Sequence, residues 1–157
     1  MSETLEYLRE KCTPEGLERL QSLGNPNVLE FISRYLRLTR PDSVYVADDS
    51  AESTEYIRRT ALEKGEERKL TMEGHTVHFD GPNDQARDKE RTCYLLPPEL
   101  DLGSRINSID REKGLEEITG LLDGIMEGKE VFILFFCLGP TFSRFSLPCV
   151  QITDSAY

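Results

Sequence analysis

The residues that could bind a metal ion are two adjacent aspartates, Asp48 and Asp49, and the two histidines of the chain, His75 and His78. No third carboxylate follows the aspartates at a ligand spacing, so the pair, followed by Ser50, predicts a turn and a helix cap rather than a cation site. The histidines are three residues apart on a predicted strand and therefore point to opposite faces, which is a poor arrangement for sharing one metal.

A second candidate is a phosphate-binding loop, which Gly124 to Glu130 superficially resembles. The stretch has too few residues between its glycines, a glutamate where Ser or Thr must hold magnesium, and a helix instead of a strand before it, so we exclude this function. Gly-x-Ser-x-Gly and His-Glu-x-x-His are also absent from the sequence. The motifs alone therefore indicate an α/β domain with no visible catalytic centre.

Arg87 lies in a polar run, Asp80 to Thr92, that is rich in charge. A guanidinium is always ionised and its planar fork matches a carboxylate with two hydrogen bonds. Without further information, the sequence favours a surface arginine paired with Asp84 or Asp88.

These residues have to be positioned by a fold that centres on the long apolar run Val131 to Leu138, which Gly139-Pro140 ends abruptly. β-Branched and aromatic residues in a continuous run predict a strand buried on both faces. The loop beyond the carboxyl end of such a strand, residues 139–144, is where ligands often sit, although the loop taken alone favours a plain turn between two strands.

The other predicted elements alternate around this strand. Thr13-Pro14 and Asn25-Pro26 each place a capping residue before a helix-starting proline, so the first third of the chain is expected to be helical. Further strands are expected at 43–47, 93–96 and 146–153, two short strands within 68–79, helices at 51–64 and 115–126, and a long loop at 99–113. The fold class is therefore mixed α/β, with a helical N-terminal third followed by a mixed sheet flanked by helices, in one domain over residues 1–157.

Charge and cysteine content restrict the partners and the compartment. The net charge of −10 argues against nucleic acid and anionic membranes as partners. No apolar stretch reaches the ~20 residues that span a bilayer, and the acidic N-terminus lacks the features of a signal peptide. Without a Cys-x-x-Cys pair, the cysteines favour reduced, buried thiols in a cytoplasmic protein, although a Cys137–Cys149 bridge between adjacent strands stays open.

Two stretches resemble a known enzyme family, the GTP-dependent phosphoenolpyruvate carboxykinases. The pattern Asp80-x-Pro82-x-Asp84-x-Ala86-Arg87 is similar to the substrate-arginine segment of that family. The strand ending at Gly139-Pro140, followed by Ser146-Leu147 and by Thr153-Asp154-Ser155-x-Tyr157, looks like its later strand pair and Thr-Asp-Ser-Pro-Tyr motif. Pro41-Asp42 and the strand leading to Asp48-Asp49-Ser50 are similar to an earlier family segment, so the motifs are collinear over roughly residues 25–157.

The resemblance implies a decarboxylating lyase that converts oxaloacetate and GTP to phosphoenolpyruvate, GDP and carbon dioxide with divalent metals, usually manganese and magnesium. It further implies that residues 1–157 are the N-terminal, substrate-binding lobe of a larger two-lobed enzyme. GTP, the metals and most catalytic groups then belong to a C-terminal lobe that is absent from the sequence, and the chain alone is expected to bind neither metal nor GTP and to be inactive.

One functional residue is carried over by the resemblance: Arg87, which would contact the carboxylate or phosphate of oxaloacetate or phosphoenolpyruvate. The sequence departs from the family pattern nearby, because Asn83 replaces the first arginine of the motif. Lys89, followed by Glu90, stands where the family has a glutamate linked to closure of a mobile lid, which puts that contact in doubt.

The alternative hypothesis is an acidic α/β module that binds a protein or a small carboxylate without catalysis, since a fold does not fix a function. Under the enzyme hypothesis, the chain should expose a former lobe interface around residues 139–146 and could self-associate through it.

Overall fold

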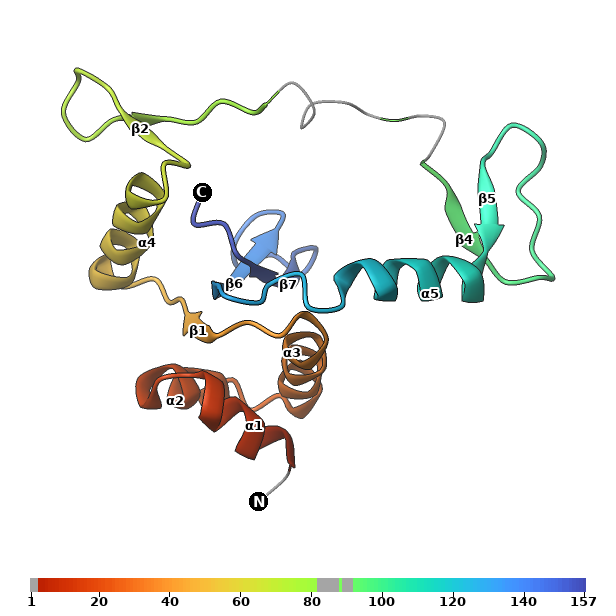
Figure 1. The fold of residues 1–157 in the computed structure, drawn as a ribbon, viewed down its shortest axis with the longest axis horizontal. Coiled ribbons are helices and arrows are strands. Elements are labelled where there is room, and N and C mark those ends of the chain that lie inside the picture. Colours follow the sequence, from red (N-terminus) through yellow and green to blue (C-terminus); the bar gives the residue numbers. More distant parts are fainter. Residues whose placement is uncertain (1–2, 82–87, 89–91) are drawn as a thin grey trace.

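The computed structural model of the chain describes residues 3–81, 88 and 92–157. Within these residues the fold is the mixed α/β arrangement that the sequence predicts, with helices gathered in the N-terminal third (Figure 1). None of the helices in these ranges is both long enough and apolar enough to cross a lipid bilayer.

The N-terminal third consists of three helices, α1 (Glu3–Lys11), α2 (Pro14–Ser22) and α3 (Pro26–Thr39). The side chain of Thr13 accepts a hydrogen bond from the Gly16 amide and so caps α2, and Asn25 caps α3 in the same way through the amides of Asn27 and Val28. The two Pro-led helix starts predicted from the sequence are therefore confirmed. Leu8, Leu20, Ile32 and Leu36 project from these helices into the core and are fully buried.

The central sheet has three strands in the order β1–β6–β7. Strand β1 (Ser43–Val46) lies parallel to β6 (Glu130–Leu138), with Val46 opposite Ile133, and β7 (Leu147–Thr153) lies antiparallel on the other side. The apolar run is thus the interior strand, as predicted. Parallel pairing of β1 and β6 requires a crossover, which the chain between Val46 and Glu130 supplies.

The expectation that the run is buried along its whole length is wrong. Val131, Phe132 and Ile133 are fully buried, but Phe135 and Phe136 are 39% and 43% exposed and Leu138 is 56% exposed. Successive residues of a strand face opposite sides of the sheet, so both faces of this end are open among the described residues.

Helix α4 (Ala51–Glu63) follows β1 and is capped by Ser50, whose hydroxyl oxygen accepts a hydrogen bond from the Ser53 amide. The chain then forms the two short strands that the sequence predicts, β2 (Arg68–Lys69) and β3 (Thr76–Val77), which pair antiparallel. His75 and His78 flank β3 instead of lying on it.

A separate unit lies at the far end of the molecule from α4 (Figure 1). It consists of β4 (Tyr94–Leu96), β5 (Ser108–Asp110) and α5 (Arg111–Leu122), and β4 and β5 pair in parallel. The predicted structureless loop at 99–113 is therefore wrong, because its last part forms β5 and the start of α5. Helix α5 packs closely on β4 at Gly114, where an added Cβ would lie 2.2 Å from Leu95 Cδ2.

Candidate functional site

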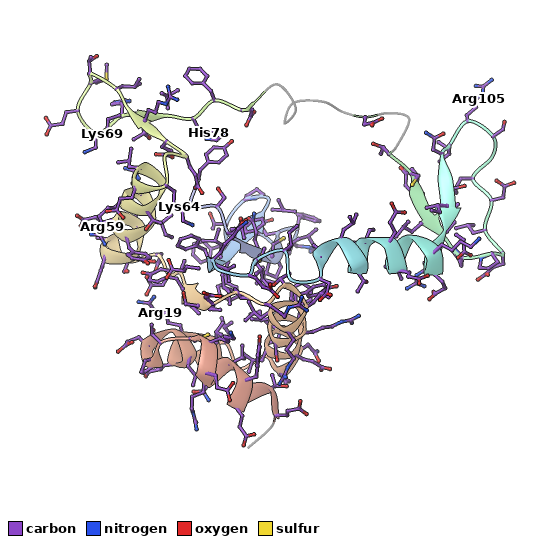
Figure 2. All side chains as sticks on the ribbon, viewed as in Figure 1. Arg19, Arg59, Lys64, Lys69, His78 and Arg105 are labelled. Carbon is purple, nitrogen blue, oxygen red and sulfur yellow. The ribbon has the colours of Figure 1, made fainter. Side chains whose placement is uncertain are left out.

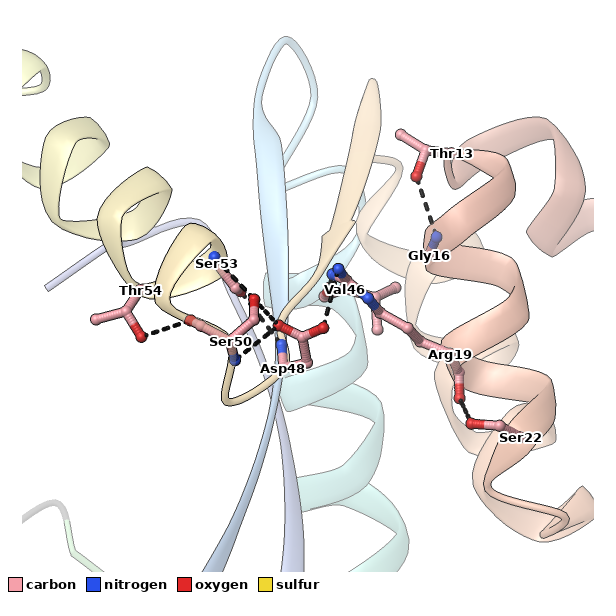
Figure 3. Close-up of polar contacts among 9 residues, drawn as sticks. All are labelled: Thr13, Gly16, Arg19, Ser22, Val46, Asp48, Ser50, Ser53 and Thr54. Atoms are coloured by element: carbon pink, nitrogen blue, oxygen red, sulfur yellow. Dashed lines mark hydrogen bonds and ion pairs between the residues drawn. The ribbon is translucent and has the colours of Figure 1, made fainter.

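Asp48, the first of the two aspartates that follow β1, holds the turn into α4 (Figure 3). Asp48 Oδ1 accepts hydrogen bonds from the amide and the hydroxyl of Ser50, at 3.1 and 2.6 Å. Asp48 Oδ2 pairs with the Arg19 guanidinium at 2.9 Å, and Arg19 also donates to the main-chain oxygen of Val46 at 2.7 Å. The predicted turn and helix cap are confirmed, with Ser50 as the capping residue and Asp48 as the group that orients it.

This arrangement keeps Asp48 ionised. The hydrogen bond from the Ser50 hydroxyl, with a further contribution from Arg19, lowers the pKa of the Asp48 carboxyl below its ordinary value. An open pocket of about 490 Å³ lies beside this turn, with Arg19, Asp48, Leu134 and Phe135 in its wall. Asp48 and Arg19 are engaged with each other and with the main chain, so these two groups of the pocket wall serve to link α2, β1 and α4.

A second polar cluster lies at the opposite end of the sheet, and we call it the His78 junction: Glu66, His78, Asp80, Ser155 and Tyr157. The His78 ring stacks on the Tyr157 ring with centroids 3.4 Å apart and 12° between the planes. His78 Nδ1 lies 2.6 Å from the main-chain oxygen of Glu66, and His78 Nε2 lies 3.3 Å from Asp80 Oδ1. The junction therefore ties together the chain after α4, the chain after β3 and the end of the described chain.

Glu66 holds the last of these segments through its carboxylate. Glu66 Oε2 accepts hydrogen bonds from the Ala156 amide at 2.7 Å and from the Ser155 hydroxyl at 3.1 Å. The Tyr157 amide in turn donates to Ser155 Oγ at 3.3 Å. These bonds fix the backbone on both sides of Ser155 and so present the Tyr157 ring to His78.

Two lysines beside the junction bind the same C-terminal segment. Lys64 Nζ donates to the main-chain oxygen of Asp154 at 2.8 Å and lies 5.0 Å from the ring centroid of Phe132. Lys129 pairs with the Asp154 carboxylate, and this hydrogen bond lowers the pKa of Asp154 from its ordinary value of 3.8. Figure 2 shows Lys64 and His78 near the end of α4, whereas Arg105 lies at the far end of the molecule.

Arg87, the residue expected to bind substrate, lies outside the described residues, as do Asn83, Asp84, Lys89 and Glu90. The described chain enters this segment at Asp80, inside the His78 junction, and leaves it at Thr92, whose amide and hydroxyl both donate to the main-chain oxygen of Asp88. The start of one family-like stretch, Asp80, and the end of the other, Tyr157, therefore both contact the His78 ring.

The Gly139-Pro140 turn lies at the other end of the β6–β7 hairpin. Phe132 pairs with Thr153, whereas Leu138 pairs with Leu147. At about 3.3 Å per residue, these two ends of the hairpin are roughly 20 Å apart. The turn region, which we call the hairpin tip (residues 138–147), is strongly apolar and exposed: Phe142 is fully exposed, and Phe145 and Leu147 are 78% and 64% exposed.

The cysteines depart from the expectation of buried thiols. Cys12 is buried, and burial raises the pKa of its thiol to about 11, but Cys93 and Cys137 are exposed. All four thiols are free. Phe136 lies opposite Cys149 and Cys137 lies opposite Pro148, so the side chains of the two cysteines point to opposite faces of the hairpin and a bridge between them is excluded.

Sequence reasoning missed Glu66 as a ligand of the C-terminal segment and His78 as a partner of Tyr157. No local signal marks Glu66, whose contacts are made 89 and 90 residues away along the chain. Within residues 3–81, 88 and 92–157, no three His, Cys, Asp or Glu side chains gather closely enough to hold a metal ion.

Comparison with known proteins gives a consistent result. Residues 30–157 match the family model described as the phosphoenolpyruvate carboxykinase N-terminal domain. The chain is 49% identical over 152 residues to the phosphoenolpyruvate carboxykinase (GTP) of Thermococcus sibiricus, which covers 97% of this chain and 24% of that protein. It is 46% identical over 157 residues to the protein of the same name from Pyrococcus furiosus, covering 100% of this chain and 25% of the relative. A more distant relative of the same name, from Saccharolobus solfataricus, is 40% identical over 157 residues, and the match covers 100% of this chain and 26% of that protein. The chain thus spans about a quarter of the length of the curated relatives that it matches.

Proposed function

Because the chain belongs to the GTP-dependent phosphoenolpyruvate carboxykinase family, as its N-terminal part, we propose that it forms the substrate-binding lobe of such an enzyme. The reaction would be the conversion of oxaloacetate and GTP to phosphoenolpyruvate, GDP and carbon dioxide. Under this proposal, Arg87 binds the carboxylate or phosphate of the substrate, and the chain alone does not turn over.

The chemistry explains why an arginine suits this place. Decarboxylation of oxaloacetate leaves an enolate, and the enolate oxygen then has to lie in line with the phosphoryl group that it accepts. Such a reaction depends mainly on positioning and on stabilisation of negative charge. A guanidinium that grips a carboxylate with two parallel hydrogen bonds fixes the substrate in both position and rotation.

The observation that carries the proposal is the His78 junction. In it, His78 links Asp80, the start of the arginine-bearing stretch, to Tyr157, because the His78 ring contacts both residues. The family resemblance depends on these two stretches, which are more than 70 residues apart in the sequence. Their link through His78 supports the view that they form one functional unit.

The remaining groups belong, in this proposal, to the part of the enzyme beyond the matched quarter. That part binds GTP and the divalent metals, manganese or magnesium, which neutralise charge on the transferred phosphoryl group. The chain's own residues then have one task, which is to hold and orient the three-carbon acid.

The hairpin tip is the surface that we assign to contact with this other part. Phe142, Phe145 and Leu147 are exposed together, and monomeric soluble proteins rarely leave such a patch uncovered. In the isolated chain the same patch would drive self-association. Light scattering over a range of concentrations tests this: the apparent mass should rise with concentration, and Phe142→Ser with Phe145→Ser should restore a constant monomer mass.

Substrate binding can be tested on the chain itself by titration with phosphoenolpyruvate, followed by NMR shifts. A dissociation constant of roughly millimolar or weaker is expected, since one bidentate pair opposes the entropic cost of binding. Arg87→Ala should abolish the shifts, and Arg105→Ala, at the far end of the molecule, is the matched control. Shifts that persist unchanged in Arg87→Ala would refute the substrate role and favour a small-carboxylate-binding module without catalysis.

A further inference from the structure

The hairpin tip contains a backbone conformation that its sequence does not favour. Phe142 has a φ of 61°, in the left-handed region that bulky side chains rarely adopt. Its side chain is fully exposed, so burial within the described chain does not offset the cost. Strained residues persist only where the surrounding structure imposes them, and they gather at sites that bind ligands or partners.

Hydrogen bonds on both sides of Phe142 impose this conformation. The Ser143 amide donates to the main-chain oxygen of Pro140 at 3.3 Å, and the Ser146 hydroxyl donates to the same oxygen. The Ser146 amide donates to the main-chain oxygen of Ser143 at 3.0 Å, and the Phe145 amide donates to Ser143 Oγ at 3.2 Å. The turn is therefore held by its own bonds and presents the Phe142 ring outward in a fixed place.

The apolar surface extends from the turn along one face of the hairpin. Leu138 pairs with Leu147, so their side chains lie on the same face, and Phe136, two residues before Leu138, lies on that face too. All three are exposed among the described residues. A preformed apolar surface of this kind loses little conformational entropy when a partner covers it.

Arg144 restricts the chemistry of such a partner. It is the only charged residue between Glu130 and Asp154 in the sequence. Its Cζ atom lies 5.3 Å from the centroid of the Phe145 ring, and no carboxylate within residues 3–81, 88 and 92–157 pairs with it. Because an unpaired buried charge is strongly unfavourable, a partner that covers the hairpin tip has to bring a carboxylate to Arg144.

Two occupants of this surface have to be weighed: a second copy of the chain and the remaining part of the enzyme. Two copies that each carry a net charge of −10 repel one another, which weakens the first choice. The relatives, of which this chain spans about a quarter, contain ample further polypeptide to form a recess. The second choice is therefore favoured.

We propose that the hairpin tip docks into an apolar recess of the remaining part of the enzyme, with Phe142 as its anchor and a carboxylate of that part facing Arg144. The inference rests on the proposed function, because it takes the chain to be one part of a longer carboxykinase. Burial of the Phe142 ring then offsets its backbone strain only in the assembled enzyme.

The test compares the same substitutions in two contexts. The first is the 157-residue chain, diluted until light scattering gives the mass of a monomer. The second is a hybrid in which residues 1–157 replace the matching quarter of the Thermococcus sibiricus protein. Phe142→Gly and Phe142→Asn remove the ring and suit a positive φ, whereas Thr141→Gly is the matched control for added flexibility in the same turn. Guanidinium unfolding and hydrogen exchange over residues 138–147 are measured in both contexts.

The two contexts should give opposite signs. In the chain alone, Phe142→Gly and Phe142→Asn should raise the unfolding midpoint by about 0.2 M, because they relieve the left-handed strain. In the hybrid the same substitutions should lower it by at least about 0.3 M, because the buried anchor is lost. Thr141→Gly should act with the same sign in both contexts.

Two further readouts report docking itself. Exchange over residues 138–147 should be at least about tenfold slower in the hybrid than in the chain alone, and Phe142→Gly should remove most of that protection. Arg144→Glu should lower the midpoint of the hybrid and leave the chain alone unchanged, whereas Arg144→Lys should retain most of the stability of the hybrid.

Three results would overturn the proposal. One is a midpoint that Phe142→Gly shifts in the same direction in both contexts, and another is tip exchange that is equally fast in both. The third is a hybrid that does not fold, because the tip would then not fit the recess of a relative that is 49% identical to this chain.

Failure of this inference can be told apart from failure of the proposed function. The phosphoenolpyruvate titration of the chain alone tests substrate binding and does not involve the hairpin tip. If that titration fails while the two contexts give opposite signs, the substrate role is wrong and the docking stands. If the titration succeeds while the signs agree, the docking is wrong and the proposed function stands.

Discussion

The two halves of strand β6 have the same kind of sequence and opposite surroundings. In the amino-terminal half, Val131, Phe132 and Ile133 are covered by β1 and the helices, and none of them is exposed. In the carboxyl-terminal half, Phe135, Phe136 and Leu138 stand open on both faces of a two-stranded ribbon. The first half belongs to a core that the chain completes by itself, and the second half projects beyond it.

The comparison teaches that apolar composition determines that a strand forms but not what covers it. A two-stranded ribbon is marginally stable in water, so the projecting half needs a partner on each face. The unit formed by β4, β5 and α5 has the same character, because Leu115, Ile118 and Leu121 on α5 are 41%, 45% and 68% exposed. Relatives about four times as long as this chain offer the additional polypeptide that could supply the cover.

The largest expected effect separates the covered half of β6 from the hairpin tip beyond its exposed half. Phe132→Ala should lower the free energy of unfolding by about 3–5 kcal/mol, because it leaves a cavity in a closed core. Phe145→Ala, at the hairpin tip, should change it by less than about 0.5 kcal/mol. Urea unfolding followed by circular dichroism measures both, and equal losses would contradict the distinction between the covered core and the projecting hairpin.

A smaller effect compares two glycines of α5. Gly114→Ala should destabilise the packing of α5 on β4 by about 1–3 kcal/mol, because its Cβ would meet Leu95. Gly120 has no atom within 4 Å of an added Cβ, so Gly120→Ala should stabilise the helix by about 0.5–1 kcal/mol. Hydrogen exchange along α5 should therefore change in opposite directions, and the same direction in both variants would show that α5 does not pack on β4.

Two helix caps test the same contrast, between the covered core and the unit formed by β4, β5 and α5. Ser50 caps α4 next to the core, and Asp110 caps α5 in the projecting unit by accepting from the Lys113 amide. Ser50→Ala should cost about 1 kcal/mol in global unfolding. Asp110→Ala should speed exchange in α5 with little change in the urea midpoint, because that helix opens locally. A full shift of the midpoint in Asp110→Ala would instead place α5 in the cooperative core.

The smallest effect is a pH dependence at the covered end of the sheet. Burial, with the hydrogen bond that Tyr56 donates to Glu130 at 2.8 Å, raises the pKa of Tyr56 from 10.0 to about 12. A raised pKa means that the folded state favours the neutral phenol, so this contribution to stability is present below pH 10 and is lost as the pH rises toward 12. Thermal unfolding at pH 9 and pH 11 measures it, and Tyr56→Phe should show a smaller decline than the unmodified chain. An equal decline in both would assign the loss to other groups.

The sequence predicted most elements of the core and fewer of those outside it. Asn25-Pro26 and Ser50 are local signals, and both begin helices where expected. Strand β5 was missed because Ser108-Ile109-Asp110 has a single apolar residue and pairs with β4 through its backbone. The exposure of Phe136 could not be predicted either, because the sequence of a strand is the same whichever polypeptide covers it.

The candidate site shows the same limit: what a local sequence signal marks could be predicted, and what tertiary contacts decide could not. Arg87 was found through a motif and lies outside the described residues, whereas the contacts of His78 depend on tertiary structure. Periodicity placed His78 on a strand face, but β3 ends at Val77 and the ring turns to Tyr157. A stack between residues so far apart in the chain leaves no pattern in either local sequence.

The central claim, that this chain is the substrate-binding lobe of a GTP-dependent phosphoenolpyruvate carboxykinase, is tested most directly in a hybrid enzyme. Residues 1–157 would replace the matching quarter of the Thermococcus sibiricus protein, and GTP-dependent decarboxylation of oxaloacetate would be measured for the hybrid and for its Arg87→Lys and Arg105→Lys variants. We predict an active hybrid whose kcat/KM falls by about 100-fold in Arg87→Lys and stays unchanged in Arg105→Lys. A folded hybrid that shows the same activity with lysine at position 87 would contradict the account.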